Sequence, residues 1–356
     1  MQWFQMCRMV CPKVFIIILN WNGLKDTLEC LESVYKLDYP NVEVIVVDNG
    51  SADNSLTVIR ENYPQVMMIE SKENLGYTGG NNVGMSYAMQ NGADYMWLLN
   101  NDTIVEADTL SKLVSTAESS PEVGIISPII YYYDQPDKIQ FWGDYLDWKK
   151  FEVLKVENLE SWDDINEMHG KTISLWGTAL LIKRDIIEKL GYLNSKYFAY
   201  HEDCEYSIRV AKAGYKCIIE PEAKLYHKDS RSTGSRKTPF QVYFRVRNYY
   251  FLWMENVEGL TRLTYFRKFL AESISYAGFL MGEKLDESAD ACFDGAWCAI
   301  RNIGGPWSGK IKMPYLMKKI FSWHPYFWAN LIRGKFMNVA FEILKRAKIR
   351  VLKIIA

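Results

Sequence analysis

Apolar runs alternate with segments of helical periodicity through the first hundred residues, and this alternation constrains the fold more than any other feature of the chain. Lys13–Asn20 and Val42–Val47 contain uninterrupted apolar runs, which predict strands covered on both faces. Between them, Leu24, Leu28 and Leu31 recur at the spacing of a helix. Strands that alternate with helices imply a mixed, mainly parallel α/β sheet with right-handed crossovers, flanked by helices.

The alternation continues along the chain. Further strands are predicted over Val66–Ile69, Tyr95–Leu99, Ile125–Tyr133, Ile173–Ile182 and Lys216–Ile219, and further helices over Ser51–Tyr63, Gly80–Gln90 and Asp203–Ala213. Ser51 is the expected N-cap of the first of these helices, and Gly214 is expected to end the last. From about Pro239 onward the chain is predicted to be helical. The aromatic residues of Tyr243–Trp253 fit either core packing or an interfacial face.

The length of 356 residues suggests about two domains. We expect an N-terminal tail over residues 1–12, an α/β domain over 13–235 and a helical, basic C-terminal region over 236–356. The net charge of -1 excludes a general polyanion binder, and no nucleic-acid partner is expected. The seven cysteines are scattered without paired metal-ligand spacing, so reduced cytosolic thiols are expected.

The C-terminal region has the composition of a membrane-surface element. Between Lys310 and Ala356, eleven lysines and arginines stand against one acid, Glu342, and Ile320–Trp328 places aromatic residues beside them. Peripheral membrane contact and plain helix packing or dimerisation both remain open. Met1–Val10 does not resemble a signal peptide, and no run reaches the ~18 apolar residues of a spanning helix. We expect a cytoplasmic protein that is peripheral at the cytoplasmic face of the membrane.

Polar residues stand where the predicted strands end, and ligands bind at the carboxyl ends of strands in such sheets. Asn20 ends the first strand and Asp48 the second. The Asp48 carboxylate can accept a hydrogen bond from a base imide or a ribose hydroxyl, and Ser51 with the following helix start offers donors. An ordinary turn and helix cap would explain the same residues.

Two further polar segments suggest a nucleotide diphosphate. Asn74–Asn82 is a glycine- and asparagine-rich loop that opens a helix, where backbone can approach a diphosphate closely. Asn100, Asn101 and Asp102 end the most apolar strand, and an acid there suits Mg²⁺ or Mn²⁺ bridging a diphosphate. A capped strand end is the alternative. No Walker spacing is present, and no Gly-x-Gly-x-x-Gly follows the first strand, which argues against a P-loop NTPase and a dinucleotide oxidoreductase.

A later cluster offers acid–base chemistry. His201, Glu202 and Asp203 lie at a predicted helix start, where a carboxylate can act as general base beside an acceptor hydroxyl. The same carboxylates could instead favour the helix dipole and pair with Arg209. His227 closes a short strand-like segment and matters only if it folds back toward Asp102.

Together these residues resemble glycosyltransferase family 2 in their order and distances, over roughly Lys13 to Arg236. The most specific stretch resembles the non-processive, rhamnosyltransferase-like subgroup, and it comprises Trp176–Ile182, Phe198–Asp203, Arg209, Gly214, Pro221 and His227. The resemblance implies a GT-A fold over 13–235. It also implies a transferase that moves a sugar, with inversion, from a UDP- or dTDP-linked donor to a glycan or lipid-linked acceptor. The Gln-x-x-Arg-Trp motif of processive synthases is absent.

The resemblance also implies roles for single residues. Asp48 would contact the nucleobase, Asp102 would bind the metal, Asp203 would be the catalytic base, and His227 would approach the metal and the diphosphate. The metal motif of the family usually begins with an acid, and Asn100 replaces it here. The remaining expected donor-binding residues are Asn20, Ser51, Asn74, Gly76, Gly80, Asn81, Asn100 and Asn101, and the loop beside donor and acceptor holds Trp176, Gly177 and Glu202.

Asp229–Thr238 is expected to form a mobile lid, because it is rich in serine, threonine and glycine and carries Arg231, Arg236 and Lys237, which can bind a diphosphate. Two rival functions are a sugar nucleotidyltransferase and a non-catalytic nucleotide-sugar-binding protein. The first normally has a glycine-rich, basic loop after its first strand, where this chain has Asn20–Gly23. The second is disfavoured by the presence of both Asp102 and Asp203. The oligomeric state is not indicated.

Overall fold

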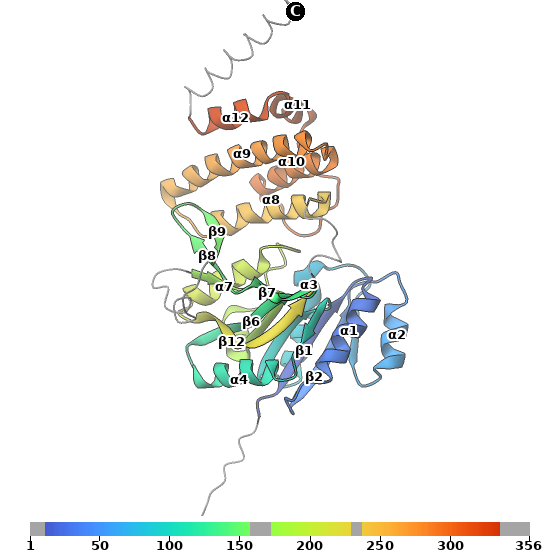
Figure 1. The fold of residues 1–356 in the computed structure, drawn as a ribbon. Coiled ribbons are helices and arrows are strands. Elements are labelled where there is room, and N and C mark those ends of the chain that lie inside the picture. The colour runs from blue at the N-terminus through green and yellow to red at the C-terminus, as the bar shows by residue number, and fades with distance from the viewer. Residues whose placement is uncertain (1–10, 157–171, 229–236, 335–356) are drawn as a thin grey trace, which may run out of the picture. The chain divides into compact units, whose positions relative to one another are not determined.

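The computed structural model describes residues 11–156, 172–228 and 237–334, and the fold is drawn in Figure 1. The chain divides into two compact units. The first is Met1–Asn194 with Glu202–Ser232, and the second is Ser195–His201 with Thr233–Ala356. The short segment Ser195–His201 therefore belongs to the helical unit although it lies inside the predicted α/β domain.

The first unit contains a nine-stranded sheet within the described residues, with strand order β3-β2-β1-β4-β11-β6-β12-β5 and β7 paired to β6. Its neighbours β3-β2, β2-β1, β1-β4 and β6-β12 are parallel, while β11 and β5 pair antiparallel. This confirms the mainly parallel α/β sheet. The strands are β1 (Val14–Asn20), β2 (Val42–Asp48), β3 (Met67–Glu70), β4 (Tyr95–Asn100), β5 (Thr103–Val105), β6 (Val123–Tyr132), β7 (Gln135–Phe141), β11 (Ala179–Lys183) and β12 (Lys216–His227).

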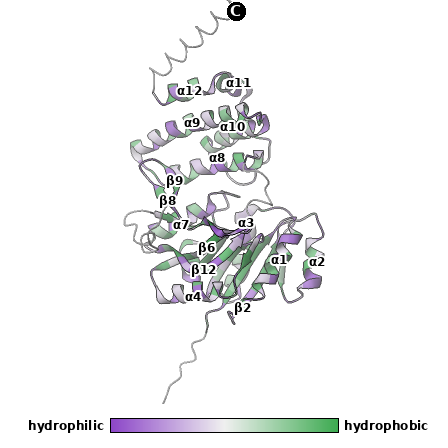
Figure 2. Ribbon diagram, viewed as in Figure 1, coloured by the Kyte–Doolittle hydropathy of each residue, from purple (hydrophilic) through white to green (hydrophobic). Residues whose placement is uncertain are grey.

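The apolar strands carry the core of this unit, and Figure 2 shows the central ones as hydrophobic. Helices flank the sheet: α1 (Leu24–Val34), α2 (Ser55–Asn62), α3 (Gly76–Gln90), α4 (Thr109–Ser119), α6 (Arg184–Leu190) and α7 (Glu202–Lys212). Helix α3 packs closely on β1, because a Cβ at Gly80 would lie 2.2 Å from Leu19 and one at Gly84 would lie 2.5 Å from Ile17. These glycines let the helix approach the sheet.

Several element boundaries differ from the sequence expectation, and the strand predicted over Lys216–Ile219 extends to His227. The helix predicted from Ser51 begins at Ser55, and Asn54 rather than Ser51 is its N-cap residue. The helix predicted from Gly80 begins four residues earlier, at Gly76. The prediction of one strand over Ile173–Ile182 is wrong, because Leu175–Thr178 forms a loop between two strands in different sheets.

The second sheet is small, and the chain crosses into it from the end of β7. Its order is β10-β8-β9, all antiparallel, with β8 (Asp144–Asp147), β9 (Glu152–Lys155) and β10 (Thr172–Ser174). The sequence analysis did not predict β7, β8 or β9, because Gln135–Lys155 lacks a regular alternation of apolar and polar residues.

The second unit is helical, as predicted from Pro239 onward. Its helices are α8 (Pro239–Met254), α9 (Gly259–Gly282), α10 (Asp286–Ile300), α11 (Tyr315–Trp323) and α12 (Pro325–Ile332). The aromatic residues of α8 pack in the core, since Phe244, Phe251 and Trp253 are fully buried. Helix α10 approaches α8 at Gly295, where a Cβ would lie 2.6 Å from the Tyr243 carbonyl oxygen. Within the described part of the chain, no helix combines the length and the apolar character that crossing a bilayer requires.

Candidate active site

The ends of β1, β2 and β4 are joined by a buried polar network. The side-chain amide of Asn20 donates to Asp48 Oδ1 (2.9 Å) and to Ser51 Oγ (3.1 Å). The backbone amide of Ser51 donates to Asp48 Oδ2 (3.1 Å). The Thr27 hydroxyl donates to Asn20 Oδ1 and accepts from the side-chain amide of Asn101. Ser51 therefore holds the Asp48 carboxylate in place instead of capping a helix, and Asn20, Asp48 and Asn101 lie together at the sheet edge.

The start of α3, which contains the glycines of the expected diphosphate loop, is tied to this edge. The Asn49 side-chain oxygen accepts from the Leu75 amide (2.9 Å), and the Asn74 oxygen accepts from the Gly76 amide (2.8 Å). The side chain of Asn81 donates to the Tyr77 carbonyl within the helix. The first amides of the expected diphosphate loop thus have protein partners, and Gly80 and Asn81 have structural roles of their own.

Asp102 and His227 face one another at the join between β4, β5 and β12. His227 pairs in register with Thr103, and its Nε2 lies 3.2 Å from Asp102 Oδ1, so this histidine does fold back toward Asp102. Both residues are buried. Burial raises the pKa of Asp102, but the hydrogen bond and charge of His227 outweigh it and hold the pKa below its usual range. Asp102 is therefore a carboxylate across the neutral pH range.

This pair fits a divalent cation. The other ring nitrogen of His227, Nδ1, lies 2.8 Å from Gln140 Oε1 and is oriented by it, which is the usual arrangement behind a metal-binding histidine. If an ion displaced the proton through which Nε2 bonds to Asp102, this nitrogen and the carboxylate oxygen would be close enough to serve as two ligands of the same ion. Among the described residues no group of three or more His, Cys, Asp or Glu could hold a metal. Asp102 and His227 would therefore share an ion with oxygen ligands from a bound substrate.

Asp203 and Glu202 begin α7 next to the loop that separates β10 from β11. The Gly177 amide donates to Asp203 Oδ2 (2.9 Å), and the Cys204 amide donates to Oδ1 (2.7 Å). Burial, and then the charge of Asp203, raise the pKa of Glu202 well above its usual range. The protonated form of Glu202 is therefore favoured. The alternative partner Arg209 binds Glu205 instead, at 2.8 Å.

The Leu175–Thr178 loop connects this carboxylate to the rest of the site. The Tyr77 hydroxyl of α3 donates to the Gly177 carbonyl, and a Cβ at Gly177 would lie 2.6 Å from that hydroxyl oxygen. Glycine is therefore required at this position. The Asn100 amide donates to the Thr178 carbonyl (2.9 Å). The loop that bears Asp102 and the loop that binds Asp203 are thus hydrogen-bonded neighbours.

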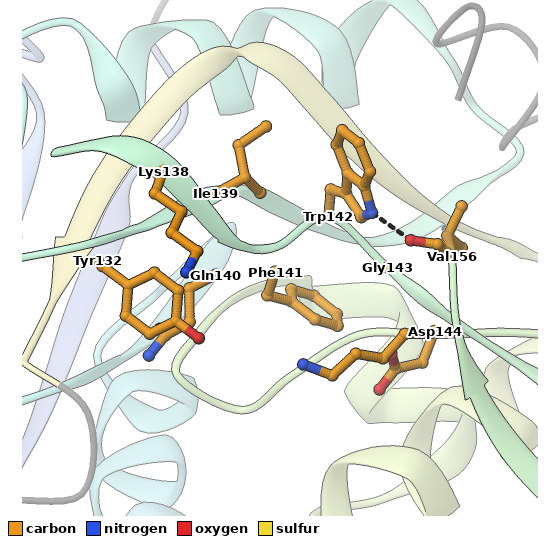
Figure 3. Close-up of a pocket in the computed structure, with 10 residues that line it drawn as sticks. Tyr132, Lys138, Ile139, Gln140, Phe141, Trp142, Gly143, Asp144 and Val156 are labelled. Carbon is orange, nitrogen blue, oxygen red and sulfur yellow. Dashed lines mark hydrogen bonds between the residues drawn. The ribbon is translucent and has the colours of Figure 1, made fainter. Parts of the chain in front are cut away.

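Sequence reasoning missed two site residues. Gln140 of β7 orients His227, and Asp144 of β8 accepts a hydrogen bond of 3.0 Å from the Trp176 indole. Both line a pocket of about 360 Å³, drawn in Figure 3. The available signal was the run Gln140–Asp144, in which two aromatic residues and a glycine lie between an amide and an acid.

The expected lid lies mostly outside the described residues, including Arg231 and Arg236. Lys237 and Thr238 are described and serve the start of α8. Thr238 caps that helix by accepting from the Gln241 amide, and Lys237 Nζ lies 3.5 Å from Glu283. The lid therefore stays a prediction.

Comparisons with known proteins identify the family. The family model described as glycosyl transferase family 2 matches residues 15–191. The chain belongs to glycosyltransferase family 2. Within that family, the chain is 24% identical over 249 residues to the low-salt glycan biosynthesis hexosyltransferase Agl10 of Haloferax volcanii, covering 65% of this chain and 73% of the relative.

Two other relatives differ in how much of their length is matched. An uncharacterised Sinorhizobium fredii protein, y4gI, is 28% identical over 239 residues, and the match spans 64% of this glycosyltransferase but 26% of y4gI. The N-acetylglucosaminyl-diphospho-decaprenol L-rhamnosyltransferase of Mycobacterium tuberculosis is 26% identical over 223 residues, covering 54% of this chain and 68% of the relative.

The fold agrees with solved glycosyltransferases. The mannosyltransferase PcManGT from Pyrobaculum calidifontis, solved in complex with GDP-Man and Mn²⁺, superposes with a TM-score of 0.51 at 17% identity, covering 94% of this chain and 88% of that one. The mainly parallel sheet with flanking helices is therefore the fold of the GT-A glycosyltransferases.

Proposed function

We propose that the chain transfers a sugar from a nucleotide diphosphate to a hydroxyl of a glycan or lipid-linked acceptor, in one inverting, non-processive step. The observation that carries this proposal is the hydrogen bond from the Asn100 amide to the Thr178 carbonyl. It makes neighbours of the loop with Asp102, suited to a metal-bound diphosphate, and the loop that fixes Asp203, suited to a general base.

The donor binds at the carboxyl edge of the sheet in this proposal. Asp48 accepts from the base or ribose, and its position is set by Asn20 and Ser51. Asp102 and His227 would hold Mg²⁺ or Mn²⁺, and the ion would offset the negative charge on the leaving diphosphate. The nucleotide of the donor is either UDP or dTDP in this proposal. Rhamnose is one candidate sugar, as in the name of the mycobacterial relative.

Asp203 is the proposed base for the acceptor. It takes the proton of the acceptor hydroxyl while that oxygen attacks the anomeric carbon, and the bond to the diphosphate breaks on the opposite face. Two amides fix its oxygens, and the protonated Glu202 avoids a second charge beside it. A single displacement inverts the anomeric configuration.

Loss of the base should separate catalysis from binding. Asp203→Asn replaces one carboxylate oxygen by a nitrogen of similar size and removes the proton acceptor. Transfer should therefore fall ~10²–10⁴-fold. Donor binding should remain, measured as protection from thermal unfolding across UDP- and dTDP-sugars with Mn²⁺ or Mg²⁺.

The same screen tests the metal. EDTA should abolish the protection given by the best donor, and Asp102→Ala should do the same with metal present. Normal turnover by Asp203→Asn would refute the base assignment. Protection unaffected by both EDTA and Asp102→Ala would refute the metal site, and protection by no nucleotide sugar would refute the donor class.

Peripheral attachment to the cytoplasmic face of a membrane is part of this proposal, because it would bring the site to a lipid-linked acceptor. Its support is the exposed apolar surface of α11 and α12.

A further inference from the structure

The pocket beside the site has no role in the mechanism given so far. It lies where β7 leaves the large sheet and β8 and β9 form the small one, and Gln140, Phe141 and Asp144 line it (Figure 3). Its volume of about 360 Å³ is at the lower end of the range for ligand pockets. A ligand group of one ring suits this volume better than an oligosaccharide.

Two buried polar atoms of this pocket lack a hydrogen-bond partner in the described structure. They are Gln140 Nε2 and Asp144 Oδ1, in side chains whose residues are 5% and 8% exposed. A buried polar group without a partner costs about 1–3 kcal/mol, so such atoms mark places where a ligand supplies the missing bond. One of the two is a donor and the other an acceptor, which together suit hydroxyl groups.

Aromatic faces complete the pocket. Phe141 stacks on Trp176 with ring centroids 4.3 Å apart and an interplanar angle of 19°. The Trp142 indole is held by its hydrogen bond to the Val156 carbonyl (Figure 3). Rigid aromatic rings with a few convergent polar groups bind ligands that are apolar on one face and hydroxylated at the edge. A pyranose ring has this chemistry.

We propose that this pocket is a sugar-binding subsite that holds one pyranose ring. One ring hydroxyl donates to Asp144 Oδ1, another accepts from Gln140 Nε2, and the C–H face of the ring packs on the aromatic side chains. The inference rests on the proposed function, since the ring must belong to a donor or an acceptor.

The position of the pocket links the ring to the chemistry. At one end Gln140 is bonded to His227, the partner of Asp102. At the other end Asp144 is bonded to Trp176, the neighbour of Gly177, whose amide fixes Asp203. A ring in this pocket thus lies between the diphosphate side and the base side of the site. Donor and acceptor both carry such a ring, and the test separates them.

The test is saturation-transfer NMR on the full chain with UDP and Mg²⁺, which is diamagnetic. The probes are the methyl glycosides of glucose, galactose, mannose, N-acetylglucosamine and rhamnose. We expect at least one to bind saturably. Asp144→Asn should weaken its binding about tenfold, because the amide keeps an acceptor for Trp176 but replaces the free acceptor by a donor. Asp147→Asn, on the same strand but outside the pocket, should leave its binding unchanged.

A second arm identifies the source of the ring. Replacing UDP by intact UDP- or dTDP-sugars should displace the glycoside if the pocket holds the donor ring, and should leave it bound if the pocket holds the acceptor ring. Absence of glycoside binding by the wild type, or equal affinity in Asp144→Asn, would overturn the subsite. Thermal protection by nucleotide, measured on the same samples, reports separately on the proposed function.

Discussion

Among single residues, Asp144 stands out because its buried environment makes this carboxyl a weaker acid than usual. Burial raises its pKa to about 6, the charge of Asp203 adds to this, and the Trp176 hydrogen bond and Lys155 oppose it. A pKa above the ordinary value means that ionised Asp144 destabilises the folded state. The cost is absent below pH ~4 and complete above pH ~6.

The variant Asp144→Asn should therefore gain stability over the wild type as pH rises. The difference in free energy of unfolding between the two proteins should grow by up to about 3 kcal/mol between pH 4 and 7, because the pKa of Asp144 is about 6 in the folded protein and near 3.8 ordinarily. Melting temperatures of both proteins at pH 4.5, 5.5 and 7.5 give this difference. Asp137→Asn, at an exposed position of β7, is the control. A difference that stays constant with pH would contradict the assignment.

Among the elements, helix α8 holds the strained segment Ser195–His201 through hydrogen bonds to its carbonyl groups. Phe198, Tyr200 and His201 all have positive φ, between 65° and 67°, which costs bulky residues about 1–2 kcal/mol each. Their backbone is held by Asn248, whose buried side-chain amide donates to the carbonyls of residues 197, 199 and 200 at 2.7–2.8 Å.

Arg247 completes this support. Its guanidinium, fully buried, donates to the carbonyls of Lys196, Tyr197 and Gly305, and its Nε donates to Asn248 Oδ1 at 2.9 Å. A strained segment persists where its surroundings over-determine it. The next two residues in the chain are Glu202 and Asp203.

Asn248→Ala should release the segment. The carbonyls of Ala199 and Tyr200 lose this donor, while that of Tyr197 keeps Arg247, and the loss should lower the free energy of unfolding by ~1–3 kcal/mol. If the network also positions Asp203, kcat should fall at a temperature where the variant is folded, while the affinity for nucleotide stays unchanged. Thermal unfolding and steady-state kinetics give the two readouts. Asn62→Ala, an exposed asparagine of α2, is the matched control. A variant with lower stability and normal kcat would limit Asn248 to a structural role.

At the scale of the whole molecule, α11 and α12 expose large apolar side chains. Tyr315, Leu316, Trp323 and Tyr326 are 52–78% exposed. The other face of these helices packs on α9, where Gly278 meets Pro325. Exposed aromatic residues beside lysines are typical of a helix that lies at a membrane surface. The basic residues after Gly334 lie outside the described residues, so their part in this surface stays a prediction.

The full chain should float with anionic liposomes at low salt, and binding should fall as salt is added, because cations near an anionic surface contribute about 1 kcal/mol each and are screened over ~8 Å at physiological ionic strength. Leu316→Ser with Trp323→Ser should reduce binding several-fold. Leu263→Ser on α9, 58% exposed, is the control. Failure of the full chain to bind at low salt would leave helix packing or an oligomer interface as the role of this surface.

Elements with a distinctive local sequence pattern could be predicted without the structure. Strands β1, β2 and β4 are continuous apolar runs, and each ends in the polar residue that the structure places at the sheet edge, namely Asn20, Asp48 and Asn100. Parallel strands bring their carboxyl ends to one edge, so the meeting of Asn20 and Asp48 followed from the pattern alone. Asp102 and Asp203 stood out at a strand end and a helix start, and the resemblance to the family gave them and His227 their expected roles.

Features that depend on contacts between residues far apart in the sequence became visible only in the folded protein. Gln140 and Asp144 gain meaning only because β7 leaves one sheet and β8 enters another, which places them beside His227 and Trp176. The assignment of Ser195–His201 to the helical unit depends on Asn248, about fifty residues away. Periodicity reports which face of an element is buried, but it carries no information on which distant side chain will satisfy a buried polar group.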